Sequence, residues 1–138
     1  MGVKVLVVDD STMMLKMIKN IVSADPDIDI SGDAVNGEEA LEKVEEINPD
    51  VVLLDIEMPV MDGIEFMKRL KLISDARVII LSKLALAGSR YVKQTMDLGA
   101  VDVIAKPAGV VSLDLENKKG HEIVKAIRKA MKLPEKSQ

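Results

Sequence analysis

The chain has 138 residues, of which 48% are hydrophobic, and a net charge of −4, which suits one folded domain with its own core and argues against a nucleic-acid partner. It has no cysteine, which excludes disulfides, thiol catalysis and zinc–thiolate sites. No apolar run is long enough to span a bilayer and no signal peptide is apparent, so we expect a cytoplasmic protein without membrane contact.

Apolar runs alternate along the chain with segments whose apolar residues recur every three or four positions. The runs predict β-strands at about Lys4–Val8, Ile28–Ala34, Val51–Leu54, Val78–Leu81 and Val101–Ile104. The other segments predict helices with buried stripes made by Leu15, Ile18 and Val22, by Leu41, Val44 and Ile47, by Ile64, Met67 and Leu70, by Val92 and Met96, and by Val124, Ile127 and Met131. Such alternation predicts an α/β fold, a flavodoxin-like doubly wound (βα)5 domain whose five-stranded parallel sheet has the order 2-1-3-4-5.

Turn residues mark the ends of the predicted helices. Asp25-Pro26, Asn48-Pro49-Asp50 and Leu98-Gly99 end the first, second and fourth helices. The connection from Pro107 to Lys119 is longer than most strand-to-helix loops, so we expect it to be functional. We predict one domain over residues 1–132, with the polar tail 133–138 as the start of a linker.

Carboxylates fall at the carboxyl ends of two predicted strands. Asp9 and Asp10 follow the first strand, and Asp55 follows the third. In the predicted order these strands are neighbours at the switch point of the sheet, where ligands bind, so the three carboxylates should crowd one site. Like charges this close repel unless a cation neutralises them, and an all-oxygen site with room for phosphate suits Mg²⁺. A simpler interpretation makes Asp9 a helix N-cap and Asp55 a turn former, but it does not explain three acids together.

A hydroxyl and a lysine follow two further strands at the same edge of the sheet. Ser82 follows the fourth strand and Lys106 follows the fifth. Taken singly, Ser82 would be a strand-end cap and Lys106 a solvated side chain. Together with the acids and Mg²⁺ they indicate phosphoryl transfer, in which an aspartyl carboxylate attacks phosphorus in line while the metal and the lysine offset charge on the equatorial oxygens.

These motifs, taken in order, resemble those of response-regulator receiver domains, and they span nearly the whole chain. They are Val8-Asp9-Asp10-Ser11, Leu54-Asp55-Ile56-Glu57-Met58-Pro59, Met61-Asp62-Gly63, Ser82 and Lys106-Pro107. The resemblance implies that Asp55 is the phosphoacceptor and also lies at the metal. It implies that Asp10 binds Mg²⁺ directly, that Asp9 supports it and that Glu57 contributes its backbone carbonyl. It makes Ser82 the switch hydroxyl, Lys106 the phosphate-binding lysine and a histidine kinase of the chemotaxis type the phosphoryl donor.

Further motifs are similar to the receiver domain of the chemotaxis methylesterase response regulators. They are Gly99-Ala100-Val101-Asp102, Lys106-Pro107-Ala108-Gly109 and Ser112-Leu113-Asp114-Leu115. In that family a linker joins the receiver to a C-terminal serine hydrolase, which demethylates glutamate esters and deamidates glutamines on chemoreceptors. This chain contains no Gly-x-Ser-x-Gly elbow. We therefore expect it to be the regulatory part, with no enzymatic activity beyond its own phosphorylation and dephosphorylation, and we expect the Pro107–Lys119 loop to contact the missing output domain or its linker.

The chain departs from the usual receiver pattern at two positions. Lys83 follows Ser82, where receivers usually have a small residue, and Val103 stands three residues before Lys106, where they usually have Tyr or Phe. Lys83 either folds over the site, which would lengthen the lifetime of a phosphoryl group on Asp55, or extends into solvent. Val103 replaces the aromatic ring of the usual switch.

Two other functions fit parts of the pattern. A stand-alone receiver would act as a phosphorylation-dependent binding module, and it would differ from a methylesterase regulator in whether the reading frame continues past Gln138. An aspartyl-phosphate phosphatase or mutase would carry its nucleophile on the first strand, with a second Asp two residues later as the acid. Here Asp55 lies on the third strand and Glu57 follows it, so we disfavour the phosphatase.

Overall fold

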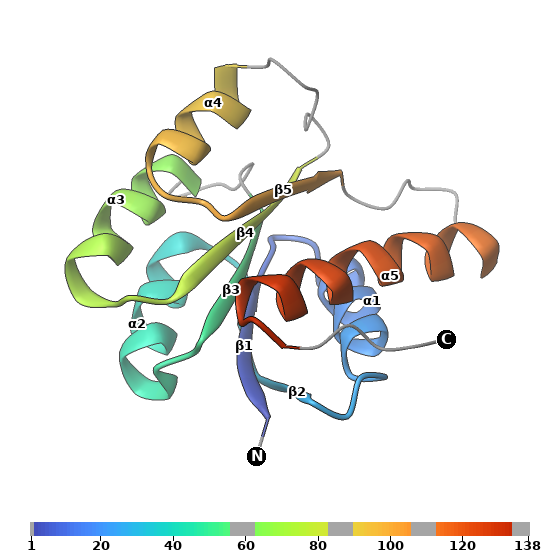
Figure 1. Ribbon diagram of the computed structural model, residues 1–138. Coiled ribbons are helices and arrows are strands. Elements are labelled where there is room, and N and C mark those ends of the chain that lie inside the picture. Colours follow the sequence, from blue (N-terminus) through green and yellow to red (C-terminus); the bar gives the residue numbers. More distant parts are fainter. Residues whose placement is uncertain (1, 56–62, 83–89, 106–112, 134–138) are drawn as a thin grey trace.

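A computed structural model describes residues 2–55, 63–82, 90–105 and 113–133. In this part of the chain strands and helices alternate strictly (Figure 1). The strands are β1 (Val3–Val8), β2 (Ile28–Ala34), β3 (Val51–Asp55), β4 (Arg77–Ser82) and β5 (Asp102–Ala105). The helices are α1 (Thr12–Val22), α2 (Gly37–Ile47), α3 (Gly63–Ile73), α4 (Arg90–Asp97) and α5 (Leu113–Ala130).

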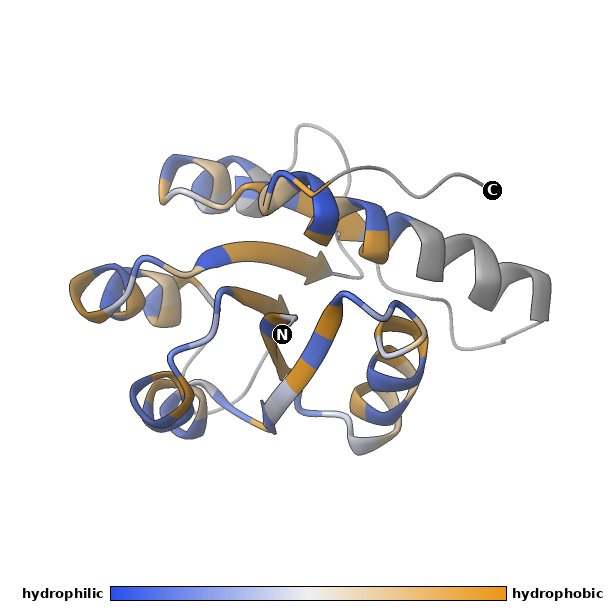
Figure 2. Cartoon of the chain, turned by 60° about the horizontal axis from the view of Figure 1, so that its bottom comes forward, coloured by the Kyte–Doolittle hydropathy of each residue, from blue (hydrophilic) through white to orange (hydrophobic). Residues whose placement is uncertain are grey.

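The strands form one parallel sheet in the order β2-β1-β3-β4-β5, which confirms the predicted fold class. Figure 2 shows helices on both sides of a sheet in which hydrophobic residues predominate. A parallel sheet covered on both faces is expected to have nearly continuous hydrophobic strands, and every residue of β3 is buried. The order reverses between β1 and β3, so the carboxyl ends of these two strands lie side by side.

Successive residues of each strand point to opposite faces and so belong to two separate cores. Leu6 and Val8 of β1 pack into the core beneath α2 and α3. Val5 and Val7 pack into the core beneath α1 and α5. Phe66 of α3 is completely buried in the first of these cores. Because aromatic residues are only 1% of the chain, aliphatic side chains and methionine fill most of the interior.

A buried cation ties α5 to the connection between α1 and β2. Arg128 donates to Asp25 Oδ2 at 2.8 Å and to Asp27 Oδ2 at 3.0 Å. Arg128 is 7% exposed and Asp25 is 3% exposed. The hydrogen bond to Asp27 is the main cause of a raised pKa at Arg128; burial opposes this effect, and Asp25 adds to it. This cluster lies at the amino-terminal edge of the sheet, opposite the edge that carries the predicted site.

Most predicted helix stripes agree with the observed burial. Leu15, Ile18 and Val22 are buried on α1, and Met67 and Leu70 are buried on α3. Five other predicted core residues are partly buried and pack against the cores: Leu41, Ile47, Ile64, Val124 and Met131. The predicted ends of the helices also hold, because Asn48 adopts a left-handed conformation (φ 52°) directly after α2 and Gly99 has φ 102° after α4.

Three expectations were wrong. Met96 of α4 is 47% exposed, whereas its neighbour Thr95 is fully buried, and the side chain of Val92, the other predicted stripe residue, lies outside the described residues. The fifth strand covers Asp102–Ala105, one residue later than predicted, and Val101 is 44% exposed. Residues 113–119 belong to α5 rather than to a long loop. This segment contains good helix formers, and the helix tolerates Gly120 in its interior, where glycine costs about 1 kcal/mol.

Candidate functional site

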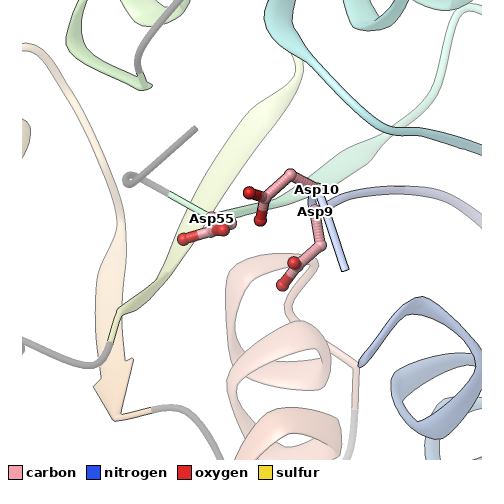
Figure 3. Close-up of side chains that lie close together, drawn as sticks. All are labelled: Asp9, Asp10 and Asp55. Atoms are coloured by element: carbon pink, nitrogen blue, oxygen red, sulfur yellow. The ribbon is translucent and has the colours of Figure 1, made fainter. Parts of the chain in front are cut away.

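The carboxylates of Asp9, Asp10 and Asp55 lie together at the carboxyl ends of β1 and β3 (Figure 3). Each offers one oxygen, and these oxygens all lie within 4.8 Å of one another. Asp9 and Asp55 are buried, at 0% and 1% exposure, whereas Asp10 is exposed. The cluster is therefore buried at Asp9 and Asp55 and open to solvent at Asp10.

The register of the sheet brings these residues together. Val8, the last residue of β1, pairs with Leu54 of β3. The acids that follow these two partners, Asp9 and Asp55, are therefore next to each other across the ladder. Asp55 also pairs with Leu81 of β4, which fixes its backbone between two neighbours in the middle of the sheet. β3 thus holds Asp55 directly, whereas Asp9 and Asp10 lie in the turn that follows β1.

The turn after β1 is held by hydrogen bonds on both sides of Asp10. The backbone N–H of Asp9 donates to the Ala34 carbonyl at 3.0 Å. Asp9 Oδ1 accepts from the Ser11 N–H at 2.9 Å, and Ser11 Oγ accepts from the Met14 N–H at 3.2 Å. Ser11, not Asp9, is the N-cap of α1, so the simpler interpretation of Asp9 as a cap was wrong.

The donor set fits a small hard cation. Within the described part of the chain it consists of carboxylate oxygens, which Mg²⁺ prefers. Mg–O distances are about 2.1 Å, so two oxygens bound to one octahedral ion lie roughly 3 to 4 Å apart. The observed spread of up to 4.8 Å is slightly larger, and the exposed Asp10 side chain can adjust to close it. A cation would also relieve the repulsion between the neighbouring carboxylates.

The remaining predicted site residues are described only in part. Ser82 is the last residue of β4, where its backbone pairs with Ala105, but its hydroxyl lies outside the described residues. Val103 lies within β5, pairs with Ile80 and packs, partly buried, against the core beneath α2 and α3. Glu57, Lys83 and Lys106 lie outside the described residues. β4 ends at Ser82 and β5 ends at Ala105, at the same edge of the sheet as the three acids. This edge therefore carries the ends of all the strands from which the site was predicted.

The cap at Ser11 was missed in the sequence. The signal was present, since a serine directly before an apolar periodic segment is a common N-cap. The salt bridge between Lys19 Nζ and Asp33 Oδ2, at 2.6 Å, was also missed. It joins α1 to the end of β2 and depends on a tertiary contact that no local pattern reveals.

Residues 5–115 match the model of the response regulator receiver domain. The chain belongs to this family. The receiver is 47% identical over 127 residues to protein-glutamate methylesterase/protein-glutamine glutaminase 1 of Syntrophomonas wolfei, a match that covers 92% of this chain and 36% of that protein. It is 50% identical over 114 residues to the corresponding protein of Halalkalibacterium halodurans, covering 83% of this chain and 33% of that protein. The receiver thus spans about a third of the length of these curated relatives.

Solved structures give the same result. The response regulator domain of Thermotoga maritima CheB superposes on this receiver with a TM-score of 0.87 at 39% identity, covering 98% of this chain and all (100%) of that one. The crystal structure of the P1 domain of CheA3 in complex with CheY6 from R. sphaeroides contains a chain with a TM-score of 0.78 at 40% identity, covering 95% of this receiver and 98% of that chain. The resemblance to the regulatory domain of chemotaxis methylesterases is therefore confirmed. Among the described residues, no helix is long and apolar enough to cross a bilayer.

Proposed function

We propose that this receiver is a phosphorylation-controlled switch in which Asp55 accepts a phosphoryl group in a Mg²⁺-dependent reaction. The main support is the convergence of Asp9, Asp10 and Asp55 within 4.8 Å at the end of β1 and β3. Asp55 is the acid that ends the central strand β3, and buried strands flank it on both sides. A carboxylate fixed in this way needs little further ordering before it attacks.

The proposed chemistry is an in-line displacement at phosphorus. An Asp55 oxygen forms a bond to phosphorus while the bond from phosphorus to the leaving group breaks, and the leaving group departs with the electron pair. The product is an acyl phosphate on Asp55. When bound, Mg²⁺ supplies positive charge that offsets the charge of the phosphoryl oxygens. Asp10 would hold the ion directly, with Asp9 behind it and the backbone carbonyl of Glu57 as a further ligand.

Ser82 and Lys106 would contact the phosphoryl group from the neighbouring strands. The Ser82 hydroxyl would donate a hydrogen bond to one phosphoryl oxygen, and the Lys106 ammonium would act as a point charge on another. Support for this assignment comes from position, because β4 ends at Ser82 and β5 ends at Ala105, one residue before Lys106, and the two ends are paired in the sheet. Movement of these two residues toward the phosphoryl group would report phosphorylation to the rest of the domain.

The proposed partner on the input side is a histidine kinase of the chemotaxis type. The relative from R. sphaeroides was crystallised as a complex between the P1 domain of CheA3 and CheY6. On the output side, the relatives are methylesterases about three times as long as the matched segment. We propose that a receiver over residues 1–132 is followed by a linker starting at 133–138, and that it regulates a methylesterase domain acting on chemoreceptors in the cytoplasm.

Intact-mass spectrometry with acetyl phosphate tests the phosphorylation. The mass should rise by one phosphoryl group in the presence of Mg²⁺, and the rise should disappear when the metal is chelated. Peptide mapping should place the modification on Asp55. A protein that gains no mass with Mg²⁺, or that gains the same mass without it, would contradict the proposal. In a chain that includes the output domain, the methylesterase activity should increase after the same treatment, which separates a regulator from a stand-alone binding module.

Asp10→Ala should weaken Mg²⁺ binding more than Asp9→Ala does. Asp10 is the exposed member of the cluster, whereas one oxygen of Asp9 already accepts from the Ser11 N–H. Even residues behind a ligand change metal affinity by about 10- to 100-fold, so loss of a direct ligand should raise the dissociation constant at least tenfold. Isothermal titration calorimetry with MgCl₂ measures this. Equal affinity in wild type and Asp10→Ala would refute the assignment.

Lys83→Ala should lose its phosphoryl group faster than wild type in the presence of Mg²⁺. We propose that the long cation next to Ser82 folds over the site, where it covers part of the path for an attacking water and helps hold the phosphoryl oxygens. The decay of phosphorylated protein after removal of the donor gives the rate. An unchanged or slower decay would show that Lys83 extends into solvent instead. Lys93→Ala on α4 is a matched control, because it removes an exposed cation elsewhere.

A further inference from the structure

Ser11 directly follows Asp9 and Asp10, and its side chain is a hydroxyl rather than a carboxylate. We propose that Ser11 is a positioning residue for the metal site, because it fixes the turn that presents Asp10. This inference rests on the proposed Mg²⁺ site. The Ser11 hydroxyl at the start of α1 would then contribute indirectly to the Mg²⁺ affinity of the site.

Each polar group of Ser11 takes part in holding the turn. Its backbone N–H donates to Asp9 Oδ1 at 2.9 Å. Its Oγ accepts from the Met14 N–H at 3.2 Å, and its carbonyl accepts from the Leu15 N–H at 2.9 Å. Its φ and ψ of −96° and 114° are those of an ordinary N-cap. Ser11 therefore fastens the turn to Asp9 on one side and to α1 on the other.

The residue before Asp10 is equally well held. The Asp9 N–H donates to the carbonyl of Ala34, the last residue of β2, at 3.0 Å. The neighbouring Asp33 is joined to Lys19 of α1 by a salt bridge of 2.6 Å. Two links therefore join α1 to the end of β2: the turn that carries Asp9, and the salt bridge between Lys19 and Asp33. Asp10 is the one member of the cluster that is exposed, and its backbone lies between these two fixed residues.

The fixed backbone matters because few protein ligands hold Mg²⁺. A ligand on an ordered backbone needs only side-chain adjustment to bind the ion, whereas a ligand on a frayed turn must also lose backbone freedom. In Ser11→Ala the Met14 N–H loses its side-chain acceptor, while the hydrogen bonds of the residue 11 backbone to Asp9 and Leu15 remain. We expect the first turn of α1 to loosen and the Asp10 backbone to sample a wider range of positions. Mg²⁺ affinity should then fall on the order of tenfold, at the lower end of the range for residues that support metal ligands.

Titration calorimetry with MgCl₂ alone tests this on four proteins, each checked for native structure by circular dichroism. These are wild type, Ser11→Ala, Ser11→Thr and Asn36→Ala. Thr keeps a capping hydroxyl and should restore the affinity. Asn36 is the matched control, because its Oδ1 caps α2 by accepting from the Glu39 N–H at 2.9 Å, and α2 contributes no carboxylate to the cluster. Asn36→Ala should weaken its helix to a similar degree without changing Mg²⁺ affinity.

The outcomes separate this inference from the proposed function. Ser11→Ala with about tenfold weaker binding, together with near-wild-type binding in Ser11→Thr and Asn36→Ala, supports the positioning role. Wild-type affinity in Ser11→Ala overturns it while leaving the metal site intact. Equal losses in Ser11→Ala and Asn36→Ala also overturn it, because they would show that general loosening of the domain is responsible. A wild-type protein that does not bind Mg²⁺ would overturn the proposed function itself, and this inference with it.

Discussion

Asp55→Asn should show no mass increase with acetyl phosphate and Mg²⁺ under conditions in which wild type is fully labelled. The amide has a similar shape but lacks the anionic oxygen that forms the bond to phosphorus. Because Asp55 is 1% exposed at the end of a buried strand, the isosteric change should leave the fold intact. Asp97→Asn, at an exposed position on α4, is the matched control and should be labelled like wild type.

Undiminished labelling of Asp55→Asn would move the phosphorylation to another residue. Peptide mapping of the labelled protein would then identify that residue. Labelling on Asp9 or Asp10 would keep the cluster as the site of chemistry and change only the identity of the nucleophile. Labelling far from the carboxyl edge of the sheet would remove the support for the proposed switch.

Phe66→Ala should lower the free energy of unfolding by about 3–5 kcal/mol. Phe66 is completely buried in the core beneath α2 and α3, and it is one of the largest side chains there. Its removal takes apolar surface out of the core and leaves a cavity that the close-packed neighbours refill only in part. Small domains are stable by only about 5–15 kcal/mol, so the variant should be close to the limit of stability.

Urea denaturation followed by circular dichroism measures the loss. Leu72→Ala is the matched control, because Leu72 lies on the same helix and is 85% exposed, so its replacement should change the stability by less than about 0.5 kcal/mol. A loss below about 1 kcal/mol for Phe66→Ala would mean that α3 packs less tightly on the sheet than its burial indicates.

The parts of the fold that the sequence predicted best are those with the strongest periodic signal. Residues Val51–Leu54 of β3 are an unbroken apolar run, and the structure buries the whole strand, Asp55 included. The stripe Leu15, Ile18 and Val22 recurs at helical spacing, and it is buried as predicted. α4 was predicted less well because it has only eight residues, and one residue of error in its phase exchanges the exposed Met96 for the buried Thr95.

The start of α5 was not predicted correctly. The connection was expected to run from Pro107 to Lys119, but α5 begins at Leu113, and the helix absorbs the penalty of Gly120 in its interior. For the candidate site, strand order and the acid at each strand end were enough to predict that Asp9, Asp10 and Asp55 meet. The Ser11 cap has a local sequence signal, but the hydrogen bond from the Asp9 N–H to the Ala34 carbonyl could not be predicted in this way, because Ala34 belongs to a strand distant in sequence.

The buried cluster of Arg128, Asp25 and Asp27 has a consequence for how the chain folds during synthesis. The arginine follows its partners by 103 and 101 residues, so almost the whole domain must leave the ribosome before the cluster can form. Until then, Asp25 lacks this cation and the face of the sheet that α5 covers stays open to solvent. Contacts of such long range slow folding, because the loop between them must close first. We therefore expect nascent chains that end before Arg128 to remain sensitive to protease, and resistance to appear abruptly once α5 has emerged.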